Sequence, residues 1–312
     1  MAKTMFESIF VANAPLDAKA LSGGSRPKLY GPTISVTVFD VGPGEAILLN
    51  IGKEGILVDG GSVSSKKRND SEAKKTFGKF PKEVVLRAVI ASHPHQDHTN
   101  FYPYMIQYET KLLKSNAAFY DNATPPADRQ WDDLTTLVKD GFPLKRMPVE
   151  TKVSLNFGSE AYLLRSKTGA EKEDGQKYWS VFLVLRYNDA WFLFTGDAMR
   201  AYEENMLAGI EGHTNRIHLL KITHHGATSG TSPKLVNRLD PSIAIASSYD
   251  DDGHRVEKET RETLHAARVV ATYQDWEPGV PKRGDVEVRT DGRTRNLGGL
   301  EGILFEVRKK ER

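Results

Sequence analysis

The chain has 312 residues, of which 39% are hydrophobic and 9% aromatic. This composition supplies enough apolar side chains for one large α/β core and argues against a chain that is disordered throughout. The 43 lysines and arginines against 41 aspartates and glutamates give a net charge of +2, which does not by itself indicate binding to nucleic acid.

Two absences narrow the class of protein further. The chain has no cysteine, so a metal ion would be bound by His, Asp, Glu or water, without a thiolate ligand. No apolar run approaches the roughly 18 residues of a membrane span, and the first residues lack the apolar core of a secretory signal. We therefore expect a cytoplasmic protein with no membrane partner.

The first 32 residues differ in character from the rest of the chain. A short apolar piece from Phe6 to Val11 is followed by a stretch rich in Gly, Ser and Pro over 22–32, which is typical of a linker. We predict an N-terminal extension or linker over 1–32, either a packed arm or a disordered tail. Residues 33–312 are then one domain.

From residue 34 onward the hydrophobic pattern predicts short strands separated by glycine turns, with a few helices between them. Strands are expected over 34–39, 46–51, 55–58, 84–91, 162–165, 181–187, 191–194, 219–223, 243–246, 269–273, 285–289 and 302–307. Helices are expected over 131–139, 199–207, 233–239 and 257–267, the third with Ser232 as its N-cap.

A cluster of candidate metal ligands directly follows the strand at 84–91. It consists of His93, His95, Asp97 and His98, and it supplies the nitrogen and oxygen donors that suit zinc, manganese or iron. Pro94 restricts the preceding residue to extended backbone, so His93 and His95 are expected on a loop. The alternative is a polar turn without a ligand. Because four ligands so closely spaced cannot all point to one ion, a site for two metal ions is considered beside a site for one.

Further candidates follow later apolar strands, where the sites of sheet proteins gather. Asp197 is either a helix N-cap or a carboxylate that bridges two cations. His224 and His225 are adjacent and would point to opposite sides of an extended backbone, so only one binds a metal directly; we favour His225. His254 is either a surface histidine in a turn or a further ligand.

Basic residues are concentrated between the third and fourth predicted strands, where the local charge is +5 over 66–82. Such a run is usually the solvated face of a loop, and the functional alternative is a rim that attracts phosphates. The residues are Lys66, Lys67, Arg68, Lys74, Lys75, Lys79 and Lys82, against Asp70 and Glu72.

These motifs resemble one family in their order along the chain. His93 to His98 has the HxHxDH form of the metallo-β-lactamase superfamily, and the flanking motifs resemble the hydrolase domain of the ComEC/Rec2 competence proteins. The similar segments are Phe39 to Ala46, Ile56 to Gly61, Phe194 to Ala198, Lys221 to Gly226, Tyr249 to His254 and Gly284 to Gly292. The resemblance covers roughly residues 34–307.

The resemblance implies a four-layer αβ/βα metallo-β-lactamase sandwich with two divalent metal ions between its sheets, zinc in preference to manganese. Many members carry another histidine after the first cluster, and this chain has none from Thr99 to Gly212. We assign its place to His225. One ion is then bound by His93, His95, Asp197 and His225, and the other by Asp97, His98, Asp197 and His254.

A dinuclear centre of this kind favours hydrolysis. Two cations lower the pKa of a bound water toward about 7 and polarise an ester oxygen. His224 or His254 would protonate the leaving group. Asp97 could orient the attacking water rather than bind a metal ion. Asp40 and Asp59 would orient the imidazoles of the ligands.

We expect a phosphodiesterase or nuclease acting on DNA or a nucleotide, with or without partner proteins. The alternatives are a hydrolase of a non-nucleic ester, such as a phosphocholine ester or a lactone, and a metal-stabilised binding module without catalysis.

Overall fold

The computed structural model describes most of the chain. The described residues are 4–12, 18–20, 28–61, 68–122, 145–149, 151–165, 180–251, 254–297 and 300–311. The helix predicted over 131–139 lies outside them, as do Lys66 and Lys67 of the basic run. None of the helices in these ranges has the length and apolar character that a membrane span requires.

Ten strands of the described residues form the first sheet, in the order β2-β1-β17-β16-β3-β4-β5-β6-β7-β8. Strands β5 to β8 run parallel to one another, and the other neighbours are antiparallel. Their bounds are β1 Thr4–Ala12, β2 Ala18–Ala20, β3 Ile34–Val38, β4 Ala46–Ile51, β5 Glu54–Gly60, β6 Val85–Ile90, β7 Leu113–Asp121, β8 Lys145–Pro148, β16 Gly284–Leu297 and β17 Leu300–Glu311.

Seven strands of the described residues form the second sheet, in the order β15-β14-β13-β12-β11-β10-β9. Strands β12 to β15 are parallel. Their bounds are β9 Lys152–Leu155, β10 Glu160–Leu164, β11 Phe182–Tyr187, β12 Ala190–Phe194, β13 Leu219–Lys221, β14 Ile243–Ala246 and β15 Arg268–Ala271.

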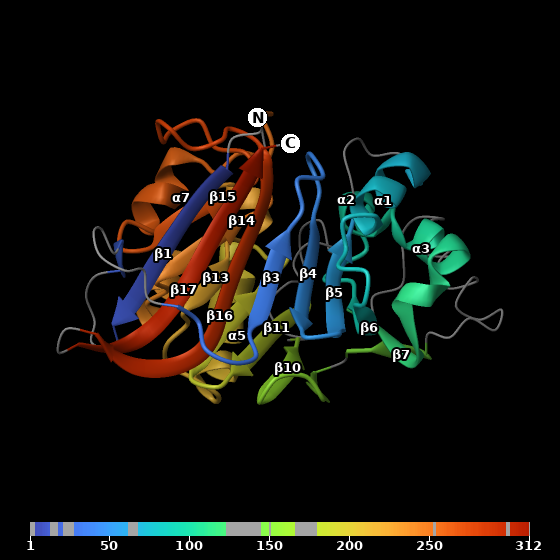
Figure 1. The fold of residues 1–312 in the computed structure, drawn as a ribbon, viewed down its shortest axis with the longest axis horizontal. Coiled ribbons are helices and arrows are strands. Elements are labelled where there is room, and N and C mark those ends of the chain that lie inside the picture. Colours follow the sequence, from blue (N-terminus) through green and yellow to red (C-terminus); the bar gives the residue numbers. More distant parts are fainter. Residues whose placement is uncertain are drawn as a thin grey trace.

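Helices and 3-10 turns follow the strands of each sheet, most of them on its outer face. Those of the first sheet are α1 Asp70–Phe77, α2 Gln96–Thr99, α3 Tyr102–Tyr108 and the 3-10 turn η1 Thr110–Leu112. Those of the second are α5 Arg200–Glu211, the 3-10 turn η3 His224–Gly226, α6 Pro233–Leu239 and α7 Lys258–Thr263. Figure 1 shows α1 and α3 beside β5 to β7, and α7 beside β15 at the opposite end of the molecule.

Alternation of side chains along the strands produces the layers. In β4, Ile47 and Leu49 belong to the core between the two sheets, whereas Leu48 belongs to the core beneath α1 and α3. In β12, Phe192 faces the first sheet and Leu193 packs against α5 and α6. The fold is therefore the expected four-layer αβ/βα sandwich.

The N-terminal segment contributes a strand to this sandwich. Residues 4–12 form β1, which pairs with β17 over its whole length, and Ile9 and Val11 are buried in the core between the sheets. This part of the extension is thus a packed arm. The division of the chain at residue 32 stays a prediction.

Most predicted elements of the described residues occur within two or three residues of their expected bounds, with four exceptions. Helix α5 continues to Glu211, beyond its predicted end at 207. Strands β16 and β17 extend well beyond 285–289 and 302–307, because β17 pairs with β16 on one side and β1 on the other. Helix α7 ends at Thr263 rather than at 267. A turn in which the Ala267 amide donates to Leu264 is needed there to lead the chain into β15.

Candidate metal centre

The first ligand cluster begins where β6 ends, at the carboxyl edge of the parallel strands. His93 lies in the loop and His95 is the extended N-cap of α2, which confirms that neither lies on a helix face. Asp97 and His98 then occupy the first turn of α2. The His93 ring centroid is 4.6 Å from that of His95 and 4.2 Å from that of His98, so three imidazoles crowd one point.

Asp197 follows β12 in the second sheet and points into this cluster. Its Oδ2 atom is 3.2 Å from His98 Nε2, 3.9 Å from His93 Nε2 and 3.5 Å from His225 Nε2. The N-cap of α5 is Met199, so the alternative in which Asp197 caps this helix is wrong. One carboxylate of the second sheet thus touches imidazoles from both sheets.

His224 and His225 form a left-handed turn rather than the extended segment that we predicted. Their φ angles are 50° and 56°, and the turn brings both imidazoles to the same centre. The extended-backbone argument for excluding one of them is therefore wrong. His224 Nε2 is 3.9 Å from Asp197 Oδ2, and His225 Nε2 is 3.6 Å from Asp97 Oδ2.

His254 lies at the outer side of the same centre. Its ring centroid is 4.9 Å from that of His225, its Nδ1 is 2.8 Å from Asp251 Oδ1, and its side chain is 29% exposed. All of the candidate ligands named from the sequence therefore lie in one neighbourhood.

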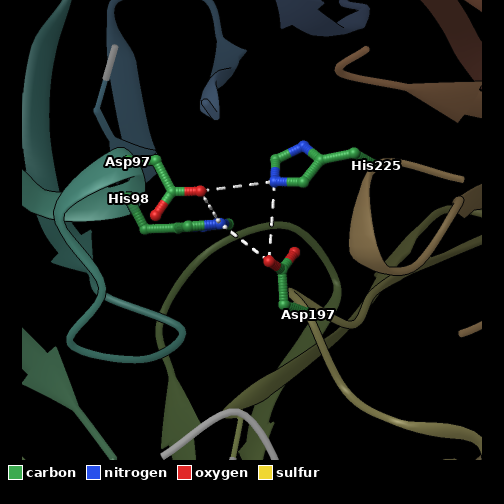
Figure 2. A group of neighbouring side chains, drawn as sticks. All are labelled: Asp97, His98, Asp197 and His225. Carbon is green, nitrogen blue, oxygen red and sulfur yellow. Dashed lines mark ion pairs between the residues drawn. The ribbon is translucent and has the colours of Figure 1, made fainter. Parts of the chain in front are cut away.

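Four of these residues surround one point in space. The potential ligand atoms of Asp97, His98, Asp197 and His225 all lie within 4.8 Å of one another. Figure 2 shows the four side chains directed inward, two from α2 and one each from the turns after β12 and β13. The structure thus places His225 with Asp97 and His98, where the scheme from sequence used His254. Which ion each residue binds stays a prediction.

The donor atoms that face this point are buried and make no hydrogen bond. They are Nε2 of His93, His98 and His225, together with Oδ1 of Asp197. Unsatisfied polar atoms in the interior are costly, and three imidazole nitrogens beside a carboxylate are a donor set that divalent cations bind well. These residues fit one or more divalent cations.

Opposing effects set the charge state of the centre. Burial opposes protonation of His98 and His225, but Asp197 and its neighbouring carboxylates raise the pKa of His98 well above its usual value and that of His225 to about 9. Burial raises the pKa of Asp97 and Asp197, yet His98 and His225 outweigh it and lower both. The two ionised carboxylates, Asp97 and Asp197, therefore favour the protonated, positively charged form of His98 and His225. A bound metal ion would supply this positive charge in place of the protons.

Hydrogen bonds from the far side fix the orientation of the imidazoles. His98 Nδ1 donates to Asp59 Oδ2 at 2.9 Å, and His225 Nδ1 donates to the carbonyl of Ser247 at 3.1 Å. Each Nδ1 thus carries a proton, and each Nε2 faces the centre, where its lone pair would be available to a metal ion that displaces the second proton. Asp59 was predicted for this position. Asp40, the other predicted carboxylate, accepts from Arg283 Nη2 at 3.0 Å.

Several supporting residues were missed in the sequence. Glu45 and Lys221 form a fully buried ion pair beneath the centre, and Glu203 is fully buried below the His224–His225 turn. The one available signal was a charged residue inside an apolar run, as with Lys221 between Leu220 and Ile222. Such a residue is either at a strand end or paired in the interior.

Glu203 gives the fold a measurable dependence on pH. It accepts from the Thr231 amide at 3.1 Å and the Ser232 amide at 2.6 Å, and burial raises its pKa from 4.5 to about 6. A folded-state pKa above the unfolded one favours folding below pH 4.5, and this contribution is lost as the pH rises through 6.

We therefore compare the free energies of unfolding of the parent and of Glu203→Gln. The difference should change by about 2 kcal/mol in favour of the parent as the pH falls from 7.5 to 4.5. Urea unfolding of both proteins across this range measures the difference, in which the other titrating groups cancel. A difference that is independent of pH would contradict the assignment.

The described part of the basic run is largely neutralised by ion pairs. Arg68 pairs with Asp70, Lys75 with Glu72, and Lys79 with Asp285 at 2.8 Å. Lys74 and Lys75 lie on α1. The residues of this helix that are buried in the core are Ala73, Thr76 and Phe77. This arrangement favours a solvated helix face over a phosphate rim for residues 68–82.

One comparison with a solved structure, a protein of the metallo-β-lactamase fold, supports this architecture. No family model matches the chain. The competence protein ComA of Neisseria gonorrhoeae is 22% identical over 215 residues, which are 69% of this chain and 27% of that protein. The metallo-β-lactamase fold protein YhfI of Bacillus subtilis is 17% identical with a TM-score of 0.50, covering 77% of this chain and 96% of that one. A diphosphatase of the PhnP family, at 11% identity, covers 82% of this chain and 98% of that one with a TM-score of 0.48.

Proposed function

We propose that this chain, which has the metallo-β-lactamase fold, is a metal-dependent hydrolase of phosphodiesters. The observation that supports it best is the set of buried donors without hydrogen bonds, contributed by three histidines and Asp197, which converge from the ends of β6, β12 and β13. A binding module could hold a metal with one sheet. A site shared between two sheets and bordered by partly exposed histidines is typical of a reactive centre.

We assign the ligands to two groups. Asp97, His98 and His225 would hold one divalent cation, His93 and His95 the other, and Asp197 would contact both. When bound, zinc or manganese supplies a Lewis acid that makes water nucleophilic near neutral pH and polarises a phosphoryl oxygen. The chain's own contribution is to hold the donors in place from behind, as Asp59 and Ser247 do for His98 and His225.

His224 and His254 are the histidines suited to proton transfer. Their side chains are 15% and 29% exposed, whereas those of His93, His98 and His225 are buried. His224 Nδ1 is 2.8 Å from Ser229 Oγ, which directs its Nε2 toward Asp197 and the centre. We assign to these two residues the protonation of the leaving group.

The substrate class rests on the resemblance to the ComEC/Rec2 competence proteins, which favours DNA. The 22% identity to a competence protein is consistent with it, although the matched part is about a quarter of that protein. The ion pairs on α1 give no support to the basic run as the phosphate-binding element.

Chelation and reconstitution test the proposal. We expect EDTA to abolish hydrolysis of bis-p-nitrophenyl phosphate and of labelled single-stranded DNA, and added manganese or zinc to restore it. Metal content, measured in parallel, should reach one to two equivalents. Turnover of p-nitrophenyl acetate or a lactone without phosphodiester turnover would reject the substrate class. Bound metal without turnover on any substrate would favour the binding module.

A further inference from the structure

A buried ion pair joins the two sheets directly beneath the metal centre. Glu45 precedes β4 in the first sheet and Lys221 ends β13 in the second, and Lys221 Nζ contacts Glu45 Oε2. Among the lysine and arginine ion pairs of the described residues, this is the only one in which neither side chain is more than 1% exposed. A charge pair so deeply buried requires a reason beyond stability, since such pairs rarely stabilise a fold more than apolar residues would.

The Glu45 end of the pair is bound to the backbone of the first ligand cluster. The Glu45 amide donates to the Asp97 carbonyl at 3.0 Å, and the Glu45 carbonyl accepts from the Gly61 amide at 2.9 Å. A Cβ atom on Gly44 would lie 2.8 Å from the Asp97 carbonyl oxygen, so the turn packs without space against the backbone of this ligand. Any movement of Glu45 therefore moves Asp97.

The same turn also reaches His225. The Ser247 hydroxyl donates to the Gly44 carbonyl, and the Ser247 carbonyl accepts from His225 Nδ1 at 3.1 Å. Ser247 thus connects the backbone of residues 44–45 to His225, a candidate ligand on the opposite sheet.

The Lys221 end is bound to the turn that carries Asp197. Lys221 Nζ donates to the Gly196 carbonyl at 3.5 Å, one residue before Asp197, and the Lys221 carbonyl accepts from the Thr195 hydroxyl at 3.3 Å. The pair therefore connects the backbone of Asp97 to the backbone of Asp197.

We propose that the Glu45–Lys221 ion pair is a positioning strut, which sets the separation of Asp97 and Asp197 across the two sheets and thereby the affinity of the centre for divalent cations. This inference rests on the cation binding of the proposed function and is independent of the substrate. Neither residue touches the reacting atoms; both act through the ligands that they hold.

The test uses the full chain with cobalt, whose visible absorption reports ligand geometry. The main variant is the double replacement Glu45→Gln/Lys221→Met, because removing one partner alone would leave a buried, uncompensated charge and favour misfolding. A matched control is Glu7→Gln/Arg268→Met. It removes another ion pair between the sheets, from β1 to β15, whose Nε–Oε2 distance is 2.8 Å, together with the pair that Arg268 forms with Glu277. None of these three residues is a candidate ligand.

We expect the main double variant to remain folded and to bind at least one cobalt ion 10-fold or more weakly than the parent, with an altered absorption spectrum. The control should keep the parental affinities and spectrum. If the main variant bound cobalt with the parental affinities, or if the control lost affinity equally, the proposal that this ion pair positions the ligands would be overturned. Failure of the parent itself to bind cobalt would instead overturn the proposed function, so the two failures are distinguishable.

Discussion

Replacing Asp197 by asparagine is expected to lower phosphodiester hydrolysis by more than about 100-fold, because even residues that merely orient metal ligands cost up to that factor when they are lost. Asp197 Oδ2 lies within 3.9 Å of Nε2 of His93, His98 and His225, so its charge serves donors from both sheets. Asparagine keeps the shape of the side chain and removes the negative charge. The measurement is the rate on bis-p-nitrophenyl phosphate together with the metal content.

The matched comparison is His254→Ala, which removes a partly exposed histidine at the outer side of the same centre. We expect a smaller loss of rate there, with nearly parental metal content. If the two variants lost equal and negligible activity, the shared role of Asp197 would be rejected. A loss of metal in His254→Ala as large as in Asp197→Asn would move His254 into the ligand set.

The position of the centre was predictable from local signals. Apolar runs end one or two residues before His93, Asp197 and His224, and the carboxyl ends of neighbouring parallel strands meet at one edge of a sheet. A strand is recognisable from such a run, whereas its partner in the sheet is not. The pairing of β1 with β17 joins the two ends of the chain and has no local signature.

The grouping of ligands was not predictable, because it depends on backbone conformations that the residue type disfavours. His224 and His225 both adopt positive φ, which histidine does less readily than glycine, and this places the two rings near one centre. The strand period that would separate adjacent side chains does not apply in such a turn. Tertiary contacts around Gly226, where a Cβ atom would lie 2.6 Å from Val256 Cα, keep the chain in this shape.

Buried charges were also beyond sequence reasoning, for a different reason. Glu45 and Lys221 are 176 positions apart, and each is unfavourable in the interior without the other. A pattern of residue types indicates that Lys221 interrupts an apolar run, but it does not identify the partner. Only the apposition of the two sheets does so.

Asp59→Asn is expected to weaken zinc or cobalt binding by about 10- to 100-fold. The Asp59 carboxylate is fully buried and accepts three hydrogen bonds: from His98 Nδ1 at 2.9 Å, from the Ser92 hydroxyl at 2.8 Å and from the Ser92 amide at 2.7 Å. Ser92 Oγ is in turn 3.0 Å from His93 Nδ1, so one carboxylate orients two imidazoles. An amide nitrogen in place of Oδ2 cannot accept from His98 Nδ1 or from the Ser92 hydroxyl, so the rings lose their fixed tautomer, while the remaining oxygen can still accept from the Ser92 amide.

Backbone strain does not complicate this test, since Asp59 has a φ of 55° and asparagine tolerates that region as well as aspartate does. The control is Ser92→Ala, which breaks the path to His93 and leaves the bond between Asp59 and His98 intact. We expect its loss of metal affinity to be smaller than that of Asp59→Asn, with both variants unfolding cooperatively. Parental affinity in folded Asp59→Asn would show that the imidazoles are oriented by packing alone, and an equal loss in both variants would place the dominant effect on His93.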